Sequence, residues 1–124
     1  MKPVLVDSSV WIDHFKKSDP LLCSLLDLGL VRGHPFVLGE LACGNVRNRS
    51  NVLQRLEQLA SLEEGWDSTQ VRSFVETEKL HGLGLGWMDA VLLTSAVKTG
   101  CDIYTRDRSL GVQAKRLGVL FSSG

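Results

Sequence analysis

The stretch GLGWMDAVLLTSAVKTGCDIYTRDRSL, from Gly84 to Leu110, predicts a helix, a short strand and a second helix in succession. WMDAVLLTSAVKTG is an apolar helix that Gly100 closes, and CDIYT is the strand that follows it. An acid, Asp89, opens the first helix, and another, Asp107, lies in a basic turn just past the strand. Two interpretations compete: both acids cap helices, or both belong to one metal site.

The rest of the chain continues this alternation of strands and helices. PVLV (Pro3–Val6) is a buried strand that stops at Asp7, and LVRGHPFV is a short strand that breaks at Gly33 and Pro35. LGELACGN is a helical turn that carries Glu40, and VLF near the end of the chain is a last strand. Four further helices are predicted: one capped by Ser8 or Ser9, PLLCSLLDLG after Asp19, NVLQRLEQLA at 51–60, and a helix at 68–80 with an Asp67/Gln70 capping box. SLGVQAKRLG is the final helix.

Such an order favours an α/β fold, in which a parallel sheet is covered by helices on both faces. No repeat or long linker divides the chain, so residues 1–124 form a single domain. Ligands of such sheets bind beyond the carboxyl ends of the strands. Asp7 and Asp107 follow strands, whereas Glu40 and Asp89 lie near the starts of helices that follow loops. The fold would therefore gather four carboxylates at one edge of the sheet.

Composition excludes several classes of protein. The chain has 124 residues, 44% of them hydrophobic, and a formal net charge of +0, so a polyanion must be bound by local basic patches. The three cysteines, Cys23, Cys43 and Cys101, show no metal-ligand spacing, which favours buried free thiols in a reducing cytoplasm. We expect no signal peptide and no membrane-spanning segment.

Each acid alone has an ordinary explanation, because acids in the first turn of a helix stabilise it by roughly 0.3–1 kcal/mol. Capping does not require four acids at one sheet edge, where their charges repel one another. A divalent cation would offset this repulsion. Oxygen ligands without nearby Cys or His indicate Mg²⁺ or Mn²⁺, ions that also bind phosphate substrates.

The segments VLVDSSVWID, VLGELACGN, GWMDAVLLTSA and IYTRDRSL resemble, in this order, the four signature segments of the PIN domain. More narrowly, they resemble VapC-type toxins of toxin–antitoxin modules, over about residues 4–119. The resemblance implies a three-layer α/β/α fold with a central, mainly parallel sheet of four to five strands. It also implies a metal-dependent ribonuclease, commonly a homodimer, that a small cognate antitoxin inhibits.

The family's acids fall on Asp7, Glu40, Asp89 and Asp107, which the resemblance makes both the catalytic and the metal-binding residues. Thr105 and Ser8 occupy the family's hydroxyl positions. Glu40 either orients the attacking water or completes the metal shell, and the site holds one ion or two. The runner-up function is a catalytically inactive PIN-like module that binds RNA or serves in assembly. Because every acid is present, we expect a Mg²⁺- or Mn²⁺-dependent endoribonuclease.

Three further features concern partners. The basic residues that flank the acids are candidate phosphate contacts: Arg106, Arg108, Lys115 and Arg116, with Arg47, Arg49 and Arg55 after Glu40. Trp87 either anchors a helix or stacks on an unpaired base. The segment from Trp11 to Leu30 is rich in apolar residues, including Phe15, Leu22 and Leu25, and either builds the core or binds the antitoxin.

Overall fold

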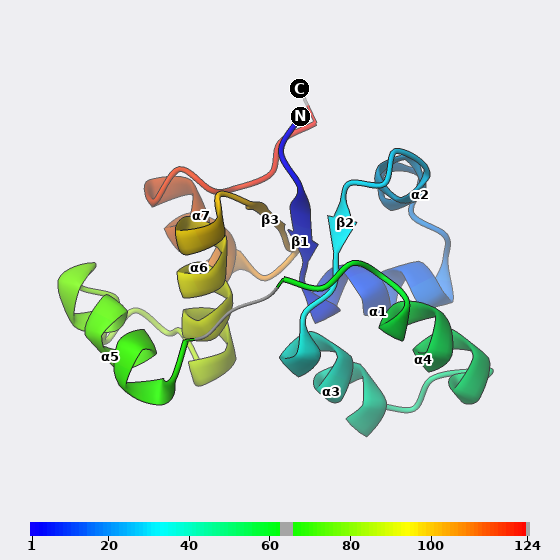
Figure 1. Cartoon of the computed structure of the whole chain (residues 1–124), viewed down its shortest axis with the longest axis horizontal. Coiled ribbons are helices and arrows are strands. Elements are labelled where there is room, and N and C mark those ends of the chain that lie inside the picture. The colour runs from blue at the N-terminus through cyan, green and yellow to red at the C-terminus, as the bar shows by residue number, and fades with distance from the viewer. Residues whose placement is uncertain (63–65, 124) are drawn as a thin grey trace.

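The computed structural model describes residues 1–62 and 66–123, which form an α/β domain as predicted. Figure 1 shows a small sheet with α5, α6 and α7 on one side and α1 to α4 on the other. The elements are, in chain order, β1 (Val4–Val6), α1 (Ser8–Lys16), α2 (Pro20–Asp27), β2 (Val31–Arg32), α3 (Pro35–Cys43), α4 (Arg49–Glu57), α5 (Ser68–Thr77), α6 (Trp87–Thr99), β3 (Asp102–Tyr104) and α7 (Arg108–Arg116).

The sheet is parallel, with strand order β2-β1-β3. Val4 of β1 pairs with Val31 of β2 and with Asp102 of β3, so the carboxyl ends of the three strands face the same way. The described residues give three strands where four to five were expected. Single bridges between Gly33 and Ser61 and between Ile103 and Leu120 continue the sheet at its two edges. The predicted VLF strand is therefore reduced to one bridge.

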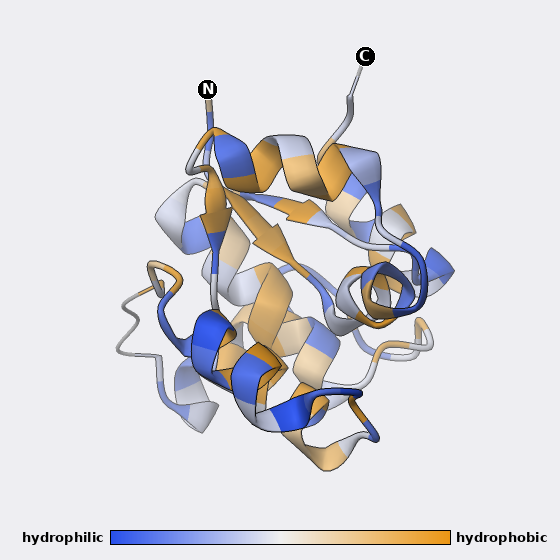
Figure 2. Cartoon of the chain, turned by 90° about the vertical axis from the view of Figure 1, so that its right-hand side faces the viewer, coloured by the Kyte–Doolittle hydropathy of each residue, from blue (hydrophilic) through white to orange (hydrophobic). Residues whose placement is uncertain are grey.

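The core lies where the two helical layers meet the sheet. All three residues of β1 are buried, and Ile103 of β3 has no exposed surface. Helix α6 is buried continuously from Ala90 to Ala96, because the sheet lies on one side of it and α5 packs on another. Figure 2 shows the apolar strands surrounded by helices that carry both hydrophilic and hydrophobic residues. This burial fixes the start of α6, and hence Asp89, against the sheet.

Several helix starts follow from local chemistry as predicted. Asp19 caps α2 by accepting hydrogen bonds from Leu21 and Leu22, and Pro20 occupies the first turn, where its missing N–H costs nothing. The Asp67/Gln70 capping box at α5 is confirmed. Gly100 ends α6 with φ of 75°, a conformation that glycine adopts without strain.

The predicted start of α1 is wrong. Asp7, and neither Ser8 nor Ser9, occupies the N-cap position, and its side chain makes no capping hydrogen bond. Both serines lie inside the helix, where their hydroxyls turn to other partners. For Asp7, the capping interpretation therefore fails.

The apolar segment from Trp11 to Leu30 mostly builds the core. Trp11, Leu22 and Leu25 are 5%, 0% and 3% exposed, so they are not available to a partner as the surface interpretation required. Helices α1 and α2 cover one face of the sheet and need these side chains to do so. Ile12 and Leu28 remain exposed, at 45% and 62%.

The cysteines form no disulfide, as predicted. Cys101 is buried, but Cys43 is exposed at the end of α3, contrary to the expectation of buried thiols. Within the described ranges, none of the helices is long and apolar enough to cross a bilayer.

Candidate active site at the carboxyl edge of the sheet

The candidate site begins where β1 and β3 end side by side. The Asp7 N–H donates a hydrogen bond of 2.9 Å to the carbonyl oxygen of Tyr104, the last residue of β3. The chain then turns from β1 into α1 and from β3 toward α7. This pairing places Asp7 next to the segment that carries Thr105 and Asp107.

Asp7 is 6% exposed, and its carboxylate is held by hydroxyl groups. Ser9 Oγ and Thr105 Oγ1 each donate a hydrogen bond of 2.8 Å to Asp7 Oδ2. Both bonds go to the same oxygen, so Oδ1 accepts none from the described residues. A buried carboxylate normally has a cation or several donors to compensate its charge, and here two hydroxyls on one oxygen are all that the described residues supply.

Asp107 is both a helix cap and a neighbour of Asp7. Its Oδ1 accepts the N–H of Leu110 at 3.0 Å, which confirms capping for this acid. Its own N–H donates to Thr105 Oγ1 at 3.0 Å, while the same hydroxyl donates to Asp7. Thr105 thus bridges the two acids.

Asp89 occupies the third position of α6, and its Oδ2 accepts the Gly86 N–H at 3.0 Å. Burial raises the pKa of Asp89, and the negative charges of Asp107 and Asp7 raise it further, while the hydrogen bond from Gly86 lowers it. The net direction is upward. Asp89, Asp7 and Asp107 therefore lie close enough for their charges to interact, although they come from three separate parts of the chain.

Glu40 approaches the other three acids through Ser8. It lies exposed on α3, and its Oε1 accepts a hydrogen bond of 3.2 Å from Ser8 Oγ. Ser8 is the residue next to Asp7. The family resemblance places a hydroxyl at Ser8, directly after the first acid. In the structure, Ser9 donates the hydrogen bond to Asp7, and Ser8 donates to Glu40 instead.

The four carboxylates share one property. Each has a single oxygen that accepts hydrogen bonds from the described residues, and leaves its second oxygen without such a bond. No Lys, Arg or His among the described residues forms an ion pair with any of them. As the side chains stand, no three Asp, Glu, His or Cys residues of the described ranges are grouped tightly enough to hold a metal ion. The charges of Asp7, Asp89 and Asp107 interact, and Glu40 is linked to them only through Ser8, so the four acids do not form a ready coordination shell.

Beside the acids lies an ionic network that the sequence did not predict. Arg106 donates to Asp13 Oδ2 at 2.6 Å and to Asp19 Oδ2 at 2.7 Å. Tyr104 Oη also donates to Asp19 Oδ2, at 2.6 Å. Only the fold brings Asp13 and Asp19 to the end of β3, some 90 positions along the chain, so no local pattern could have revealed the pairing.

This network holds Asp19 in its ionised form. Burial of Asp19 tends to raise its pKa, but the Tyr104 hydroxyl, the two N–H groups that it caps and the Arg106 guanidinium outweigh burial and lower it. Arg106 also donates its backbone N–H to Ser9 Oγ at 3.0 Å. Arg106 therefore helps to position Ser9, which binds Asp7. Because the Arg106 guanidinium is bound to two carboxylates, it is not free to contact RNA.

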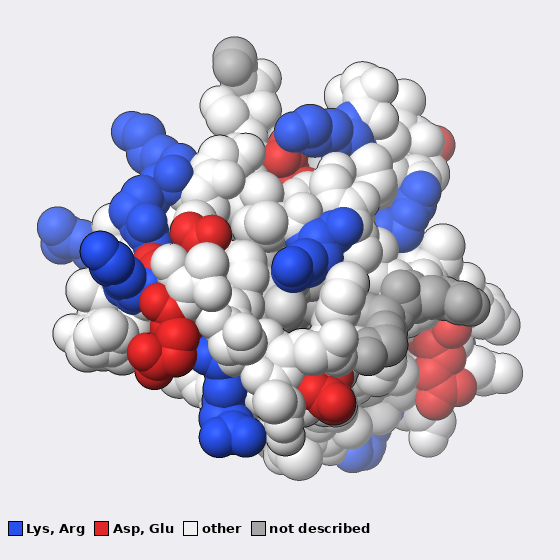
Figure 3. All heavy atoms as spheres, turned by 60° about the vertical axis from the view of Figure 1, so that its left-hand side comes forward, with Lys and Arg blue, Asp and Glu red and all other residues white. Residues whose placement is uncertain are grey.

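The other basic residues differ in how free they are. Arg116 donates to Gln113 Oε1 and to the Glu78 carbonyl oxygen, both at 2.8 Å, and Arg49 donates to the carbonyl oxygens of Gly44 and Ala42. Arg108 and Lys115 are exposed on α7 and make no hydrogen bond or ion pair with the described residues. Positive and negative side chains are interspersed on the face that Figure 3 shows.

Comparison with known proteins identifies the family. No family model matches the chain. Two proteins named Ribonuclease VapC32, from Mycobacterium tuberculosis strains CDC 1551 / Oshkosh and ATCC 25618 / H37Rv, are each 38% identical to it over 117 residues. The match covers 94% of this chain and 94% of each relative. The chain therefore belongs to the family of VapC-type PIN-domain toxins.

Proposed function

We propose that the protein is the ribonuclease toxin of a toxin–antitoxin pair, and that it hydrolyses phosphodiester bonds in RNA with Mg²⁺ or Mn²⁺. Asp7, Glu40, Asp89 and Asp107 are the proposed catalytic and metal-binding residues. The kinship with proteins named as ribonucleases supports the activity. One observation supports the site: each of the four carboxylates keeps an oxygen free of hydrogen bonds from the described residues, and no basic side chain among those residues neutralises it.

The donor set fits a hard divalent cation. Carboxylate oxygens with no Cys or His among them suit Mg²⁺ or Mn²⁺. A cation would also relieve the repulsion that raises the pKa of Asp89. When bound, such an ion supplies a Lewis acid for the phosphate and lowers the pKa of a coordinated water.

The residues of the chain have separable roles in this proposal. Asp7, Asp89 and Asp107 hold the cation, directly or through water. Ser9 and Thr105 fix Asp7 Oδ2, so that Oδ1 is presented in one orientation. Glu40 is exposed and accepts a hydrogen bond only from Ser8 among the described residues, which suits a group that orients the attacking water or completes the metal shell.

The proposed partners are a cognate antitoxin and a second copy of the chain. A cavity of about 240 Å³ lies between α1 and α3 and is lined by Ile12, Phe15, Leu41 and, at one side, Glu40. An antitoxin segment bound over this cavity would reach the carboxylates and could place an Arg or Lys against them, where a charge-assisted contact would block the site. The protein is proposed to act in the cytoplasm.

The direct test combines cleavage with metal binding. Purified protein is incubated with structured RNAs in EDTA, Mg²⁺ or Mn²⁺, and thermal unfolding is followed in the same buffers. We expect cleavage only with a divalent ion, together with a rise in Tm that Asp7→Asn abolishes and the exposed control Asp27→Asn retains. RNA binding without cleavage under every condition would instead favour the inactive RNA-binding module.

A further inference from the structure

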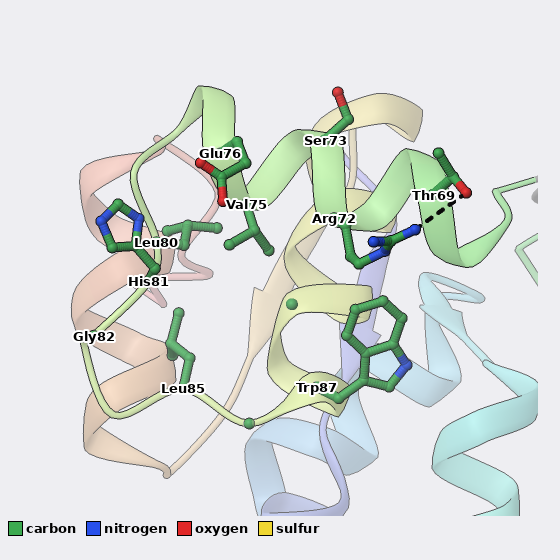
Figure 4. A pocket seen from close by; sticks show the side chains of 12 residues that line it. Thr69, Arg72, Ser73, Val75, Glu76, Leu80, His81, Gly82, Leu85 and Trp87 are labelled. Carbon is green, nitrogen blue, oxygen red and sulfur yellow. Dashed lines mark hydrogen bonds between the residues drawn. The ribbon is translucent and has the colours of Figure 1, made fainter.

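A large cavity borders the candidate active site but contains none of its four acids. It measures about 630 Å³ and lies between α5, α6 and the glycine-rich loop that joins them. Figure 4 shows its lining, with Arg72 and Trp87 at one end and His81 and Glu76 at the other. Pockets that bind small molecules commonly have volumes of about 300–1,000 Å³, so this cavity is large enough to hold a nucleobase.

Trp87 gives the cavity an aromatic wall. It is the first residue of α6, 47% of its surface is exposed, and its ring makes no hydrogen bond or aromatic contact with the described residues. Val75, Leu80 and Leu85 add apolar surface to the lining. An exposed indole beside apolar side chains offers a surface on which an unpaired base can stack, and stacking of this kind tolerates every base.

Arg72 gives the Trp87 end of the cavity a positive charge, while Glu76 carries a negative charge at the opposite end. It extends from α5 toward Trp87 (Figure 4), and its only hydrogen bond is a long one, 3.5 Å, to Thr69 Oγ1. No carboxylate in the described part of the chain pairs with it. In contrast to Arg106, which is held by two acids, Arg72 is free to contact a phosphate or the edge of a base.

The cavity borders the proposed catalytic centre through Gly86. Gly86 lines the cavity, and its N–H is the group that holds Asp89. Trp87 and Asp89 are two residues apart on one helix, so they lie about 3 Å apart along its axis and point to different sides. An RNA strand whose phosphate lies at the carboxylates can therefore pass over the start of α6 and place a neighbouring base in the cavity.

We infer that this cavity binds one unpaired base of the RNA substrate next to the phosphate that is cleaved, with Trp87 stacking on the base and Arg72 contacting its backbone or edge. The inference rests on the proposed ribonuclease function. The base must be unpaired, since a base inside a duplex cannot enter the cavity.

Trp87 also lines a second, smaller cavity together with Phe36 and Trp66. Phe36 is 50% exposed, so this side of Trp87 belongs to an apolar surface that a second copy of the chain could cover. Phe36 does not line the larger cavity. Comparing variants of Trp87 and Phe36 therefore distinguishes an RNA base from a second copy of the chain as the group that covers Trp87.

The first experiment measures RNA binding without cleavage. In an Asp7→Asn background, fluorescence anisotropy follows a short labelled single-stranded RNA and a matched duplex, and light scattering gives the oligomeric state. Trp87→Ala should weaken single-strand binding roughly tenfold or more, Trp87→Phe should recover most of that loss, and Arg72→Gln should weaken it severalfold. Phe36→Ala should bind as the parent does. The inference would be overturned if Trp87→Ala bound single-stranded RNA with the same affinity as the parent. It would also be overturned if the Trp87 and Phe36 variants both lost self-association and bound RNA equally weakly, because the Trp87 surface would then serve a second copy of the chain.

The second experiment uses the active protein and a substrate pair. One RNA carries a base beside the cleaved phosphate, and the other is abasic at that position. Wild type should show a higher KM for the abasic RNA, whereas Trp87→Ala should cleave both RNAs with the same, higher KM and a nearly unchanged kcat. Identical KM values for the two RNAs with wild type would refute the base site. If wild type cleaves neither RNA, the ribonuclease proposal fails, and the binding experiment still decides whether the cavity takes a base.

Discussion

At the scale of single residues, the four acids differ in which groups hold their carboxylates, and we therefore propose different roles for them. Asp107 has a structural task as the cap of α7, whereas Asp7 stands at an N-cap position without capping. The ionised form of Asp89 is unfavourable at its position, because burial and two neighbouring charges raise its pKa. An acid kept ionised at such a site lowers the stability of the fold, which is the pattern expected of a functional group.

Asp89→Asn should therefore abolish cleavage, by more than roughly 100-fold, without lowering stability. The folded-state pKa of Asp89 is raised, so its charge destabilises the fold at neutral pH, and the wild type regains that stability as the pH falls through this pKa. At pH 7 the Tm of the variant should equal or slightly exceed that of wild type, and the difference should disappear in acid. Its Tm should no longer respond to Mg²⁺ or Mn²⁺. Cleavage at the wild-type rate would exclude Asp89 from the site.

Asp19 is the opposite case, an acid whose charge stabilises the fold. Its lowered pKa means that its contribution is present above the ordinary aspartate pKa of about 3.9 and is lost as the pH falls through the folded-state value. Asp19→Asn keeps a capping side chain but loses its charged contacts with Arg106 and Tyr104. Urea unfolding at pH 7 should show a loss of roughly 1–3 kcal/mol, and the loss should shrink toward zero in acid.

The matched control for this prediction is Asp27→Asn, which removes an exposed acid without recorded contacts near the end of the same helix. It should change the free energy of unfolding by less than about 0.5 kcal/mol at every pH. A loss for Asp19→Asn that persists unchanged at low pH would mean that the side chain acts through packing rather than through its charge.

At the scale of elements, local signals predicted the helices better than the sheet. The Asp19-Pro20 start, the Asp67/Gln70 box and the glycine end of α6 are encoded within a few residues, and all three are confirmed. The edges of the sheet depend on partners far along the chain, and the expected VLF strand became a single bridge at Leu120.

The candidate site shows the same distinction between local signals and contacts that depend on the whole fold. The order of strands predicted four acids at one edge of the sheet, and the charges of three of them, Asp7, Asp89 and Asp107, interact. The network of Asp13, Asp19 and Arg106 depends on side-chain contacts that no local pattern reveals.

Helix α7 carries the prediction that belongs to this scale. Of the basic residues proposed to bind RNA, Arg106 and Arg116 have partners within the protein, whereas Arg108 and Lys115 have none in the described residues. Arg108 directly follows Asp107, so we expect it to contact a phosphate. Arg108→Gln should weaken binding of all RNA sequences alike and reduce the slope of log K against log[salt] by roughly 0.7. Lys98→Gln, at the far end of α6, serves as the control and should leave the slope unchanged. The same slope in both variants would show that α7 only faces solvent.

At the scale of the whole molecule, neutrality shapes how partners are recognised. A formal net charge of +0 provides no long-range attraction for RNA, so binding depends on a few free cations near four acids that repel phosphate unless a metal ion intervenes. The same acids attract a cationic side chain. A protein that carries an Arg or Lys to this edge can therefore compete with metal and substrate together, which makes the cavity beside Glu40 a suitable place for an inhibitor.

The antitoxin prediction follows from what α1 leaves exposed. Trp11 and Leu25 belong to the core, so their replacement would unfold the protein and reveal little about a partner. Ile12 lines the cavity beside Glu40 and is 45% exposed, whereas Leu28, which is 62% exposed, does not line that cavity.

Ile12→Glu should weaken binding of the co-expressed antitoxin by roughly 30-fold or more, as for an apolar residue central to an interface. Leu28→Glu should leave that binding unchanged. Both variants should fold and cleave RNA as wild type does, so that in cells only Ile12→Glu escapes neutralisation and remains toxic. Isothermal titration with purified antitoxin decides the matter: unchanged affinity for Ile12→Glu, or an equal loss for Leu28→Glu, would place the antitoxin on another surface.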